Sequence, residues 1–416
     1  MSKGKVIVGL SGGVDSTVAA YLLKEQGYDV IGVTMEMWPG EHSAEAISDA
    51  RRVAENIGIP FEVLDFKKEF RECVVNDFME QYQKGLTPNP CIVCNRLVKG
   101  QALLDKAHEM GAEYIATGHY AQIAEHRGHY YLKNAADIQK DQTYFLWMLT
   151  EENLRKTIFP LGGLTKTEVR QIALEHGFET LSKKAESQDI CFIPNNDYRS
   201  FLSEQGVEVE GGNYIDASGK ILGLHKGYCY YTIGQRKGLG IALGSPKHVT
   251  HIDAQNNTVT LGEHDELYTT VVRAKNYHVR DIDWLQETAE VEARIRYKSP
   301  AIKGQLTIVD SQLQIHFNEP VWADCGSLDN TFNMVSDGSR KDKMTFYFLI
   351  TKQIQCEMNR DKLDAPTRFV NWYKSNRDYL PTDLRDCLNT NDHNAIKHIQ
   401  SEESATLIHD FNEWFF

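Results

Sequence analysis

The fold is decided near the amino terminus by the stretch VIVGLSGGVDS, residues 6–16. The apolar run from Val6 to Leu10 predicts a buried strand, and the amphipathic segment from Asp15 to Gln26 predicts a helix. The turn between them therefore lies where backbone N–H groups and the helix dipole form an anion site. Its two glycines let the backbone approach a phosphate closely, and its serines add hydroxyl donors.

Taken alone, this Ser-Gly-Gly turn is equally consistent with a serine-capped loop. It lacks the Gly-Lys-Ser/Thr ending of a Walker loop and the third glycine of a dinucleotide fingerprint. Asp15 would repel a phosphate directly, so we expect it beside a divalent cation. Mg²⁺ with ATP is the expected pair.

The first two hundred residues alternate short apolar runs with amphipathic segments, which predicts an α/β domain with helices on both faces of a parallel sheet. From about Gly211 the chain changes to short alternating runs that are typical of small antiparallel sheets. We predict four parts: a nucleotide-binding catalytic domain at 1–205, a small central domain at 206–268, an incomplete or altered β-barrel at 269–323, and an extension of unknown fold at 324–416. Expected strands are Val30 to Met35, Ile59 to Phe66 and Tyr114 to Thr117; expected helices are Ser43 to Asn56, Lys67 to Lys84 and Arg96 to Met110.

Composition supports several domains, because 416 residues exceed what a single hydrophobic core holds together. The formal net charge of -13 argues against indiscriminate nucleic-acid binding, which depends on Lys and Arg displacing counterions. A nucleic-acid partner would need local basic groups such as Arg236-Lys237, Lys247 and Arg294 to Lys298. The sequence shows no signal peptide and no membrane-length apolar run, so we expect a soluble, cytoplasmic protein with reduced thiols and no membrane contact.

Two of the eight cysteines form a CxxC pair, Cys91 and Cys94, in a proline-containing loop before the helix expected to begin near Arg96. A helix N-terminus stabilises thiolate, which is the nucleophilic form. A structural zinc would want a second CxxC, which the chain lacks, and a thioredoxin-like pair stays open although the Asn-Pro loop does not resemble one. Cys191 alone indicates a small buried apolar residue.

The combined motifs resemble one family, the tRNA-specific 2-thiouridylases, which are PP-loop ATP pyrophosphatases that make 2-thiouridine at the tRNA wobble position. The resemblance runs from residue 1 to about 320. The matching stretches are Gly9 to Ser16, Thr87 to Asn95, Ala116 to Ala121, Lys140 to Leu146, Ser187 to Phe192, Gly223 to His225, and Tyr231 to Gly240.

The resemblance implies a PP-loop domain, a small central domain and a C-terminal β-barrel that grip the anticodon arm of tRNA. It implies a sulfurtransferase in which Cys94 is the nucleophile and Cys191 carries persulfide sulfur. It also implies a sulfur-donor protein, such as a cysteine desulfurase or a sulfur relay protein, and we expect a monomer. The implied ATP contacts are Gly9, Leu10, Ser11, Gly12, Gly13, Val14, Asp15, Ser16, Met35 and Gly118; the implied tRNA contacts are Asn89, Pro90, Cys91, His119, Lys140, Asp141, Gln142, Arg296 and Tyr297.

The implied chemistry is physically coherent. The O2 atom of uridine is a poor leaving group, so adenylation turns it into AMP before sulfur attacks C2. A persulfide on Cys191 can then deliver sulfur while Cys94 assists its release, which closes a transient disulfide that a reductant reopens. The target base must leave its stack to reach the site.

The chain departs from the family pattern at two places. Many members carry Asp where this chain has Cys91, so Cys91, Cys94 and Cys191 could instead ligate a 4Fe-4S cluster with one open iron. After Ala323 the sequence diverges from the usual end of the barrel, through either a frameshift or an appended segment.

Two other functions stay open from the sequence. A PP-loop ligase acting on a small carboxylate would share Ser11 to Ser16 but would have no use for Cys94 and Cys191. Alternatively, the altered C-terminal region could leave a catalytically inactive tRNA-binding relative.

Overall fold

The computed structural model describes residues 2–126, 128–182, 190–193, 197–274, 289–295, 297, 299–309, 312–322, 333–336 and 344–347. By its backbone contacts the chain divides into two compact units, Met1–Gln355 and Cys356–Phe416, and every described residue belongs to the first. No helix in this described part is both long and apolar enough to cross a membrane.

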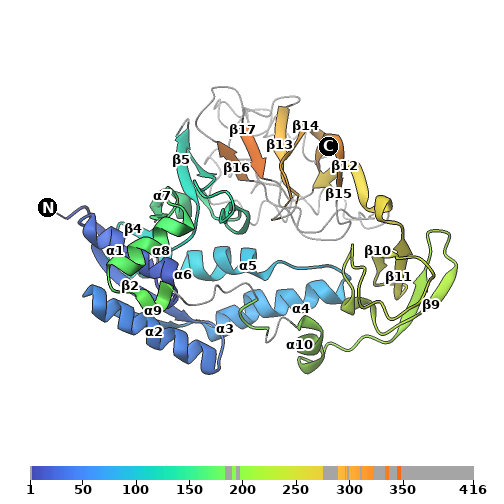
Figure 1. Ribbon diagram of the computed structural model, residues 1–416, viewed down its shortest axis with the longest axis horizontal. Coiled ribbons are helices and arrows are strands. Elements are labelled where there is room, and N and C mark those ends of the chain that lie inside the picture. The colour runs from blue at the N-terminus through green and yellow to red at the C-terminus, as the bar shows by residue number, and fades with distance from the viewer. Residues whose placement is uncertain are drawn as a thin grey trace, which may run out of the picture. The chain divides into compact units, whose positions relative to one another are not determined.

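A five-stranded sheet forms the first domain, and all of its strand pairs are parallel (Figure 1). The strand order is β3-β2-β1-β4-β7, with the strand that leads into the glycine loop at the centre. This confirms the predicted parallel α/β domain. The strands are β1 (Lys5–Gly9), β2 (Asp29–Glu36), β3 (Phe61–Asp65), β4 (Tyr114–Ala116) and β7 (Thr157–Ile158), and a separate hairpin joins β5 (Gln122–His126) to β6 (His129–Lys133).

Helices follow most of these strands, as the alternation of apolar and amphipathic segments predicts. The α-helices are α1 (Val14–Glu25), α2 (Glu41–Ile57), α3 (Lys67–Phe70), α4 (Asn76–Gln83), α5 (Pro90–Val93), α6 (Gln101–Glu109), α7 (Glu151–Lys156), α8 (Lys166–Glu175), α9 (Glu179–Ser182) and α10 (Tyr198–Glu204). Shorter helical turns are η1 (Arg71–Val75) and η2 (Cys94–Gly100), both π-helical, and the 3₁₀ turns η3 (Thr143–Phe145), η5 (Tyr228–Tyr230) and η6 (His264–Leu267).

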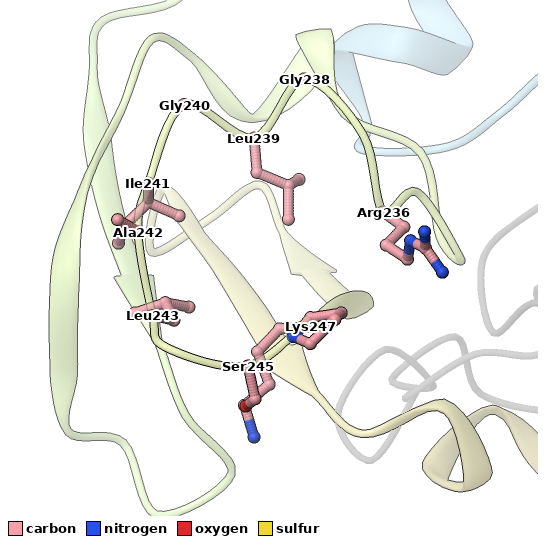
Figure 2. A pocket seen from close by; sticks show the side chains of 10 residues that line it. Arg236, Gly238, Leu239, Gly240, Ile241, Ala242, Leu243, Ser245 and Lys247 are labelled. Atoms are coloured by element: carbon pink, nitrogen blue, oxygen red, sulfur yellow. The ribbon is translucent and has the colours of Figure 1, made fainter.

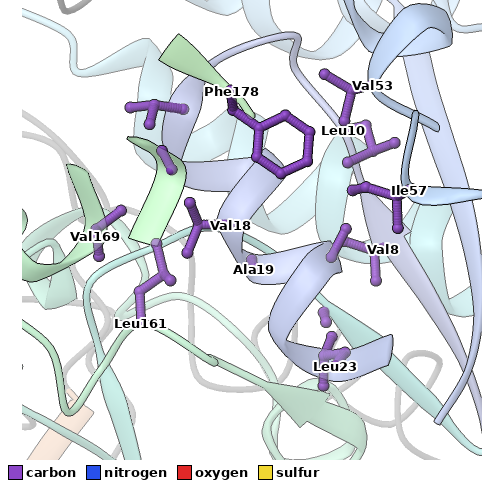
Figure 3. Packing of buried hydrophobic residues seen from close by; sticks show 14 of the residues in the cluster. Val8, Leu10, Val18, Ala19, Leu23, Val53, Ile57, Leu161, Val169 and Phe178 are labelled. Carbon is purple, nitrogen blue, oxygen red and sulfur yellow. The ribbon is translucent and has the colours of Figure 1, made fainter. Parts of the chain in front are cut away.

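The central strand buries side chains on both faces, because successive residues of a strand point to opposite sides. Val6 and Val8 pack with α1, α2 and α8 in one apolar cluster, part of which is shown in Figure 3. Ile7 packs on the opposite face with Leu103 and Leu104 of α6. The sheet is therefore covered on both sides, and the loop after β1 lies at one edge of a rigid core.

The helix that carries the CxxC pair begins earlier than the sequence predicts. It starts at Pro90 and runs without a break through α5, η2 and α6 to Glu109, so the predicted start near Arg96 was wrong. Proline fits the first helical position, where its missing N–H removes no intrahelical hydrogen bond. Cys91 and Cys94 are thus part of the helix instead of preceding it.

The chain after residue 205 forms two further sheets. Each of them contains one parallel strand pair, and its other pairs are antiparallel. In the four-stranded sheet β10-β11-β8-β9 the β8–β11 pair is parallel, which differs from the predicted antiparallel texture. The six-stranded sheet has the order β12-β15-β14-β13-β17-β16, and its last two strands come from the predicted C-terminal extension. The strands are β8 (Gly212–Ile215), β9 (Ile221–His225), β10 (His248–Asp253), β11 (Thr258–Gly262), β12 (Tyr268–Ala274), β13 (Ala289–Ala293), β14 (Ile302–Val309), β15 (Gln312–Trp322), β16 (Asn333–Ser336) and β17 (Met344–Tyr347).

An aromatic cluster joins the first domain to the residues that follow it. Phe192 is 1% exposed, and its ring centroid lies 5.5 Å from that of Phe70, 5.4 Å from that of Phe78 and 5.2 Å from that of Phe201. Phe192 directly follows Cys191, so this packing fixes the position of the cysteine. The domain boundary near 205 stays a prediction, because one apolar cluster contains residues from both sides of it.

Replacing Phe192 by alanine should lower the free energy of unfolding by about 3–5 kcal/mol, because it deletes a buried ring and leaves a cavity. Urea unfolding followed by tryptophan fluorescence measures this loss. Phe192→Leu refills part of the cavity and should cost clearly less. A Phe192→Ala variant as stable as the parent protein would contradict the packing described here.

Candidate active site

The glycine loop is held in place by its neighbours in the sheet. The backbone N–H of Leu10 donates a hydrogen bond to the carbonyl of Val33 at 2.8 Å, and Thr34 Oγ1 donates to the carbonyl of Leu10 at 2.7 Å. The N–H of Ser11 donates to Ser16 Oγ at 3.1 Å, which closes the loop on itself. The ATP residues predicted from Gly9 to Ser16 therefore form one ordered turn.

Two features of this turn suit a phosphate. Gly13 is the N-cap residue of α1 and has no side chain, so the first N–H groups of the helix are not covered by a capping side chain. Gly12 has φ of +71°, and a Cβ there would lie 2.7 Å from the carbonyl oxygen of Ala46. Only glycine fits this position.

Gly118 brings a second segment against the same turn. A Cβ at Gly118 would lie 2.6 Å from the backbone nitrogen of Ser16 and 2.7 Å from the carbonyl carbon of Asp15. The segment after β4 therefore touches the first turn of α1, where the resemblance placed an ATP contact. Met35 is half-buried on β2 and packs against the cluster that contains Ile7, so its predicted contact with ATP stays a prediction.

Asp15 does not project as a free carboxylate. Lys166 Nζ lies 2.8 Å from both of its carboxylate oxygens, and the hydroxyl of Tyr120 donates to Oδ1 at 2.8 Å. Sequence reasoning missed Lys166, which is 151 positions away along the chain. The expected divalent cation beside Asp15 stays untested, but a lysine already occupies that place.

The thiols expected to react differ in exposure. Cys94 is 5% exposed and its Sγ lies 3.8 Å from Met37 Sδ, whereas Cys91 and Cys191 are exposed. Cys94 belongs to the same apolar cluster as Phe192, the neighbour of Cys191. The helix that begins at Pro90 and the distant segment at 190–193 thus bring the three thiols into one region.

Electrostatic coupling links these thiols to each other. The pKa of Cys94 is raised to about 12, mainly because the thiol is buried; the ammonium of Lys99 opposes this rise, and Cys191 and Cys91 add to it. Cys91 and Cys191 reach the surface, yet the protein atoms around their thiols displace much of the water, and this desolvation raises the pKa of both against the opposing charge of Lys99. Burial therefore works against the expected thiolate at Cys94, which stays a prediction.

Lys99 is a second residue that sequence reasoning missed. It is half-buried and lies five positions after Cys94 within the π-helical turn η2. A π-helix brings residues five apart close together. In this turn, a Cβ added to Gly100 would lie only 2.7 Å from the carbonyl oxygen of Asn95, five positions before it. Burial lowers the pKa of Lys99, but the three thiols outweigh it, and the pKa is raised overall.

His119 lies next to the Gly118 contact and is kept neutral. Its Nδ1 and Thr117 Oγ1 are 2.7 Å apart. The pKa of His119 is lowered to about 3, first because the ring is buried and then because Lys99 is close. Lys99 therefore connects the cysteine helix electrostatically with the segment that touches the nucleotide turn.

The other predicted tRNA contacts occupy varied surroundings. Asn89 is the N-cap residue of α5, Pro90 is buried behind it, and Lys140 is half-buried. Asp141 is only 2% exposed, and its carboxylate accepts hydrogen bonds from the backbone N–H of Ala135 and of Thr143.

The remaining two described contacts connect separate segments. Gln142 Oε1 accepts from the N–H of Tyr120 at 2.9 Å, which ties this loop to His119. Tyr297 packs its ring 4.7 Å from that of Phe145. Arg296 lies outside the described residues. All of these tRNA contacts stay predictions.

The metal hypotheses find limited support in the arrangement of side chains. Among the residues that the structure describes, no three His, Cys, Asp or Glu side chains are grouped so that they could hold a metal ion. The thiolates around an iron–sulfur cluster stand farther apart than the ligands of a single ion, so the cluster hypothesis for Cys91, Cys94 and Cys191 stays a prediction.

Two of the predicted basic residues line a separate pocket in the region after residue 205. Arg236 and Lys247 line it, and the backbone that joins them through Gly240 and Leu243 curves around it (Figure 2). Lys247 is ion-paired with Glu263, whereas the described part of the chain shows no ion pair for Arg236. This loop belongs to the stretch that carried the family resemblance.

The raised pKa of Cys94 predicts how its reactivity depends on pH. Its alkylation by iodoacetamide, quantified by peptide mass spectrometry, should rise about tenfold per pH unit from pH 7 to pH 10 without levelling off, because the thiolate fraction keeps growing below the pKa. Lys99→Met should slow the reaction at pH 8, since the lost cation leaves the thiolate less stable.

Lys84→Met, which removes an exposed lysine paired with Glu80, is the matched control and should leave the rate unchanged. A rate that levels off below pH 8, or an unaffected Lys99→Met variant, would contradict these electrostatics.

Comparison with known proteins gives a consistent assignment. The model of the tRNA methyl transferase HUP domain matches residues 4–195, and that of the tRNA methyl transferase PRC-barrel domain matches residues 199–263. The tRNA-specific 2-thiouridylase MnmA 1 of Clostridium botulinum is 48% identical over 329 residues, covering 76% of this chain and 92% of that protein. The tRNA-specific 2-thiouridylase MnmA of Clostridium perfringens is 46% identical over 331 residues, covering 77% and 92%.

Among solved structures, the U34-tRNA thiolase NcsA from Methanococcus maripaludis with its 4Fe-4S cluster aligns at 21% identity and a TM-score of 0.32, over 49% of this chain and 64% of that one. So small an overlap carries no argument about the site. The alignment with each of the two clostridial proteins covers most of this chain and most of that protein. This chain therefore belongs to the tRNA-specific 2-thiouridylase (MnmA) family.

Proposed function

We propose that this chain is an ATP-dependent tRNA-uridine 2-sulfurtransferase that places sulfur on the wobble uridine. One observation carries the proposal beyond family membership: the nucleotide turn and the thiols are joined through the segment from Gly118 to Tyr120. Gly118 touches the turn at Ser16, and its neighbour His119 feels the charge of Lys99, which couples to Cys94 and Cys191. This proximity supports a site in which an activated base and a sulfur nucleophile meet.

The first step is the activation of uridine by ATP. The uridine O2 attacks the α-phosphorus, pyrophosphate leaves, and N3 loses its proton, so that C2 carries an adenylate. The turn from Gly9 to Ser16 would hold the phosphates with its N–H groups and with the Ser11 and Ser16 hydroxyls. With a pKa near 3, His119 is a poor proton acceptor, so we assign it to hydrogen bonding with the target base.

The second step is the transfer of sulfur. The terminal sulfur of a persulfide on Cys191 attacks C2. The C2–O2 bond breaks, and O2 departs as part of AMP. The thiolate of Cys94 then attacks Cys191 Sγ, which breaks the S–S bond and leaves sulfur on C2, while N3 regains a proton. The product is 2-thiouridine, and a dithiol reductant reopens the Cys94–Cys191 disulfide.

The exposure of the two cysteines suits these roles. Cys191 is exposed and can be loaded by a sulfur-donor protein, whereas Cys94 is buried and is protonated at neutral pH. A buried thiol at Cys94 does not compete with Cys191 for sulfur from the donor, and it does not react freely with oxidants. Lys99 is the group that can stabilise the Cys94 thiolate when it is needed.

We further propose that the anticodon arm of tRNA binds over the described basic and aromatic residues, among them Arg236 and Tyr297, in a cytoplasmic protein. A cysteine desulfurase or a sulfur relay protein would supply the sulfur. The persulfide route is favoured over an iron–sulfur cluster, because Cys191 is exposed to a sulfur donor while Cys94 is buried. Anaerobically purified protein should contain less than stoichiometric iron and remain active; an iron-dependent activity would reverse this preference.

The decisive experiment is mass analysis of tRNA nucleosides after incubation with ATP, a dithiol reductant and a persulfide source. The full chain should produce 2-thiouridine and AMP. Cys94→Ser and Cys191→Ser should each reduce the product to background, since each removes a sulfur that forms or breaks a bond. Cys73→Ser, which alters a half-buried cysteine outside this group, is the matched control and should retain activity.

Other outcomes favour the alternative functions. ATP-dependent AMP formation with a small carboxylate that survives Cys94→Ala would indicate a PP-loop ligase. tRNA binding without thiouridine in any condition would indicate an inactive relative.

A further inference from the structure

The charge of the nucleotide turn depends on a residue that neither the motifs nor the family resemblance assigns. We propose that Lys166, in place of a divalent cation, balances Asp15, and that Lys166 and Tyr120 position this carboxylate so that ATP can bind the turn. The proposal rests on the ATP-dependent function proposed above and adds a positioning residue to that same site.

The geometry is that of a bidentate ion pair. Lys166 Nζ lies 2.8 Å from both carboxylate oxygens of Asp15, and the Tyr120 hydroxyl donates to Oδ1 at 2.8 Å. The side chain of Lys166 is 9% exposed and that of Asp15 is 33% exposed. This burial distinguishes the pair from solvent-exposed surface pairs, which contribute little.

The backbone around Lys166 holds its ammonium in this position. Lys166 is the first residue of α8, and its own N–H donates to Asp137 Oδ2 at 3.0 Å. Thr165 caps the helix, in a reciprocal capping box with Glu168. The backbone of Lys166 is therefore held in place, and its side chain extends to Asp15 of α1.

The helix itself gains nothing from a lysine at this position. A cation in the first turn opposes the helix dipole, whereas a carboxylate in the first turn of α1 agrees with it. Asp15 is therefore a partner that stabilises Lys166. This pairing with the nucleotide turn explains why α8 begins with a lysine.

The same geometry argues against Asp15 as a magnesium ligand. Mg²⁺ requires oxygen ligands in nearly octahedral geometry at about 2.0–2.1 Å, and it binds through carboxylates or substrate phosphates. Both oxygens of Asp15 are already in contact with the ammonium. A Mg²⁺ ion that accompanies ATP would then use phosphate oxygens and water instead of this side chain.

Neutralising Asp15 matters because of where it lies. It is the second residue of α1, and Gly118 packs directly against its backbone at the mouth of the turn. An unpaired carboxylate there would repel a triphosphate; paired with Lys166, it leaves the turn electrically neutral and open to the phosphates.

Calorimetric titration of the full chain with ATP tests the proposal in four proteins: wild type, Lys166→Met, Asp15→Asn and the double variant. Lys166→Met should weaken ATP binding by roughly tenfold or more, because it leaves the carboxylate unpaired. Adding Asp15→Asn should restore most of that loss, since the repelling charge is gone. A lysine that only supported the packing of α8 would show no such rescue.

Magnesium provides the second readout. Asp15→Asn should need the same Mg²⁺ concentration for half-maximal ATP binding as wild type. A severalfold higher requirement in Asp15→Asn, or a double variant that binds no better than Lys166→Met, would overturn the proposal. Thermal melting identifies any variant that fails to fold, and Lys166→Arg, which keeps the charge, should retain most of the affinity.

The two proposals fail separately. Tight ATP binding by the wild type without 2-thiouridine would reject the proposed function and leave the Lys166–Asp15 pairing standing. Normal thiolation with no rescue in the double variant would reject only the pairing. Lys84→Met is the lysine control and should leave ATP affinity unchanged.

Discussion

The site depends on one steric constraint, the contact of Gly118 with the first turn of α1. No other residue fits there, because any Cβ would meet the backbone of Ser16 at 2.6 Å. This contact brings the end of β4 to the nucleotide turn, and it carries His119 and Tyr120 with it. Tyr120 then reaches Asp15, and Gln142 joins the 140s loop to the same segment. A single backbone approach therefore assembles parts of the site from three stretches of the chain.

A balance of burial and charge governs the sulfur chemistry. Burial favours neutral groups, so it keeps Cys94 protonated and His119 uncharged, while the cation of Lys99 acts on both. The nucleotide turn follows the same principle with a different cation, since Lys166 compensates Asp15. The charges at these two places are thus set by neighbouring side chains, within one helical turn for Cys94 and across 151 positions for Asp15, which couples the reactivity of each group to the integrity of the fold.

Sequence reasoning succeeded where the signal is local. The strand, the glycine turn and the helix around Gly12, and the parallel sheet that they begin, follow from periodicity over neighbouring residues. The start of the cysteine helix was misplaced because proline suggests a loop, although it fits the first helical position at Pro90. Lys166 and Lys99 were missed, because a pairing across 151 positions and a π-helical turn leave no local pattern. The parallel β8–β11 pair depends on tertiary packing in the same way.

The pairing of β17 with β13 gives the divergent end of the chain a structural task. Glu292 and Ala293 pair with Thr345 and Phe346 along that border. A strand at the margin of a sheet presents unsatisfied backbone donors and acceptors to other chains, and covering it prevents intermolecular association. In the described residues β16 pairs with the outer side of β17, so the unfamiliar segment moves the open margin of the sheet from β13 to β16.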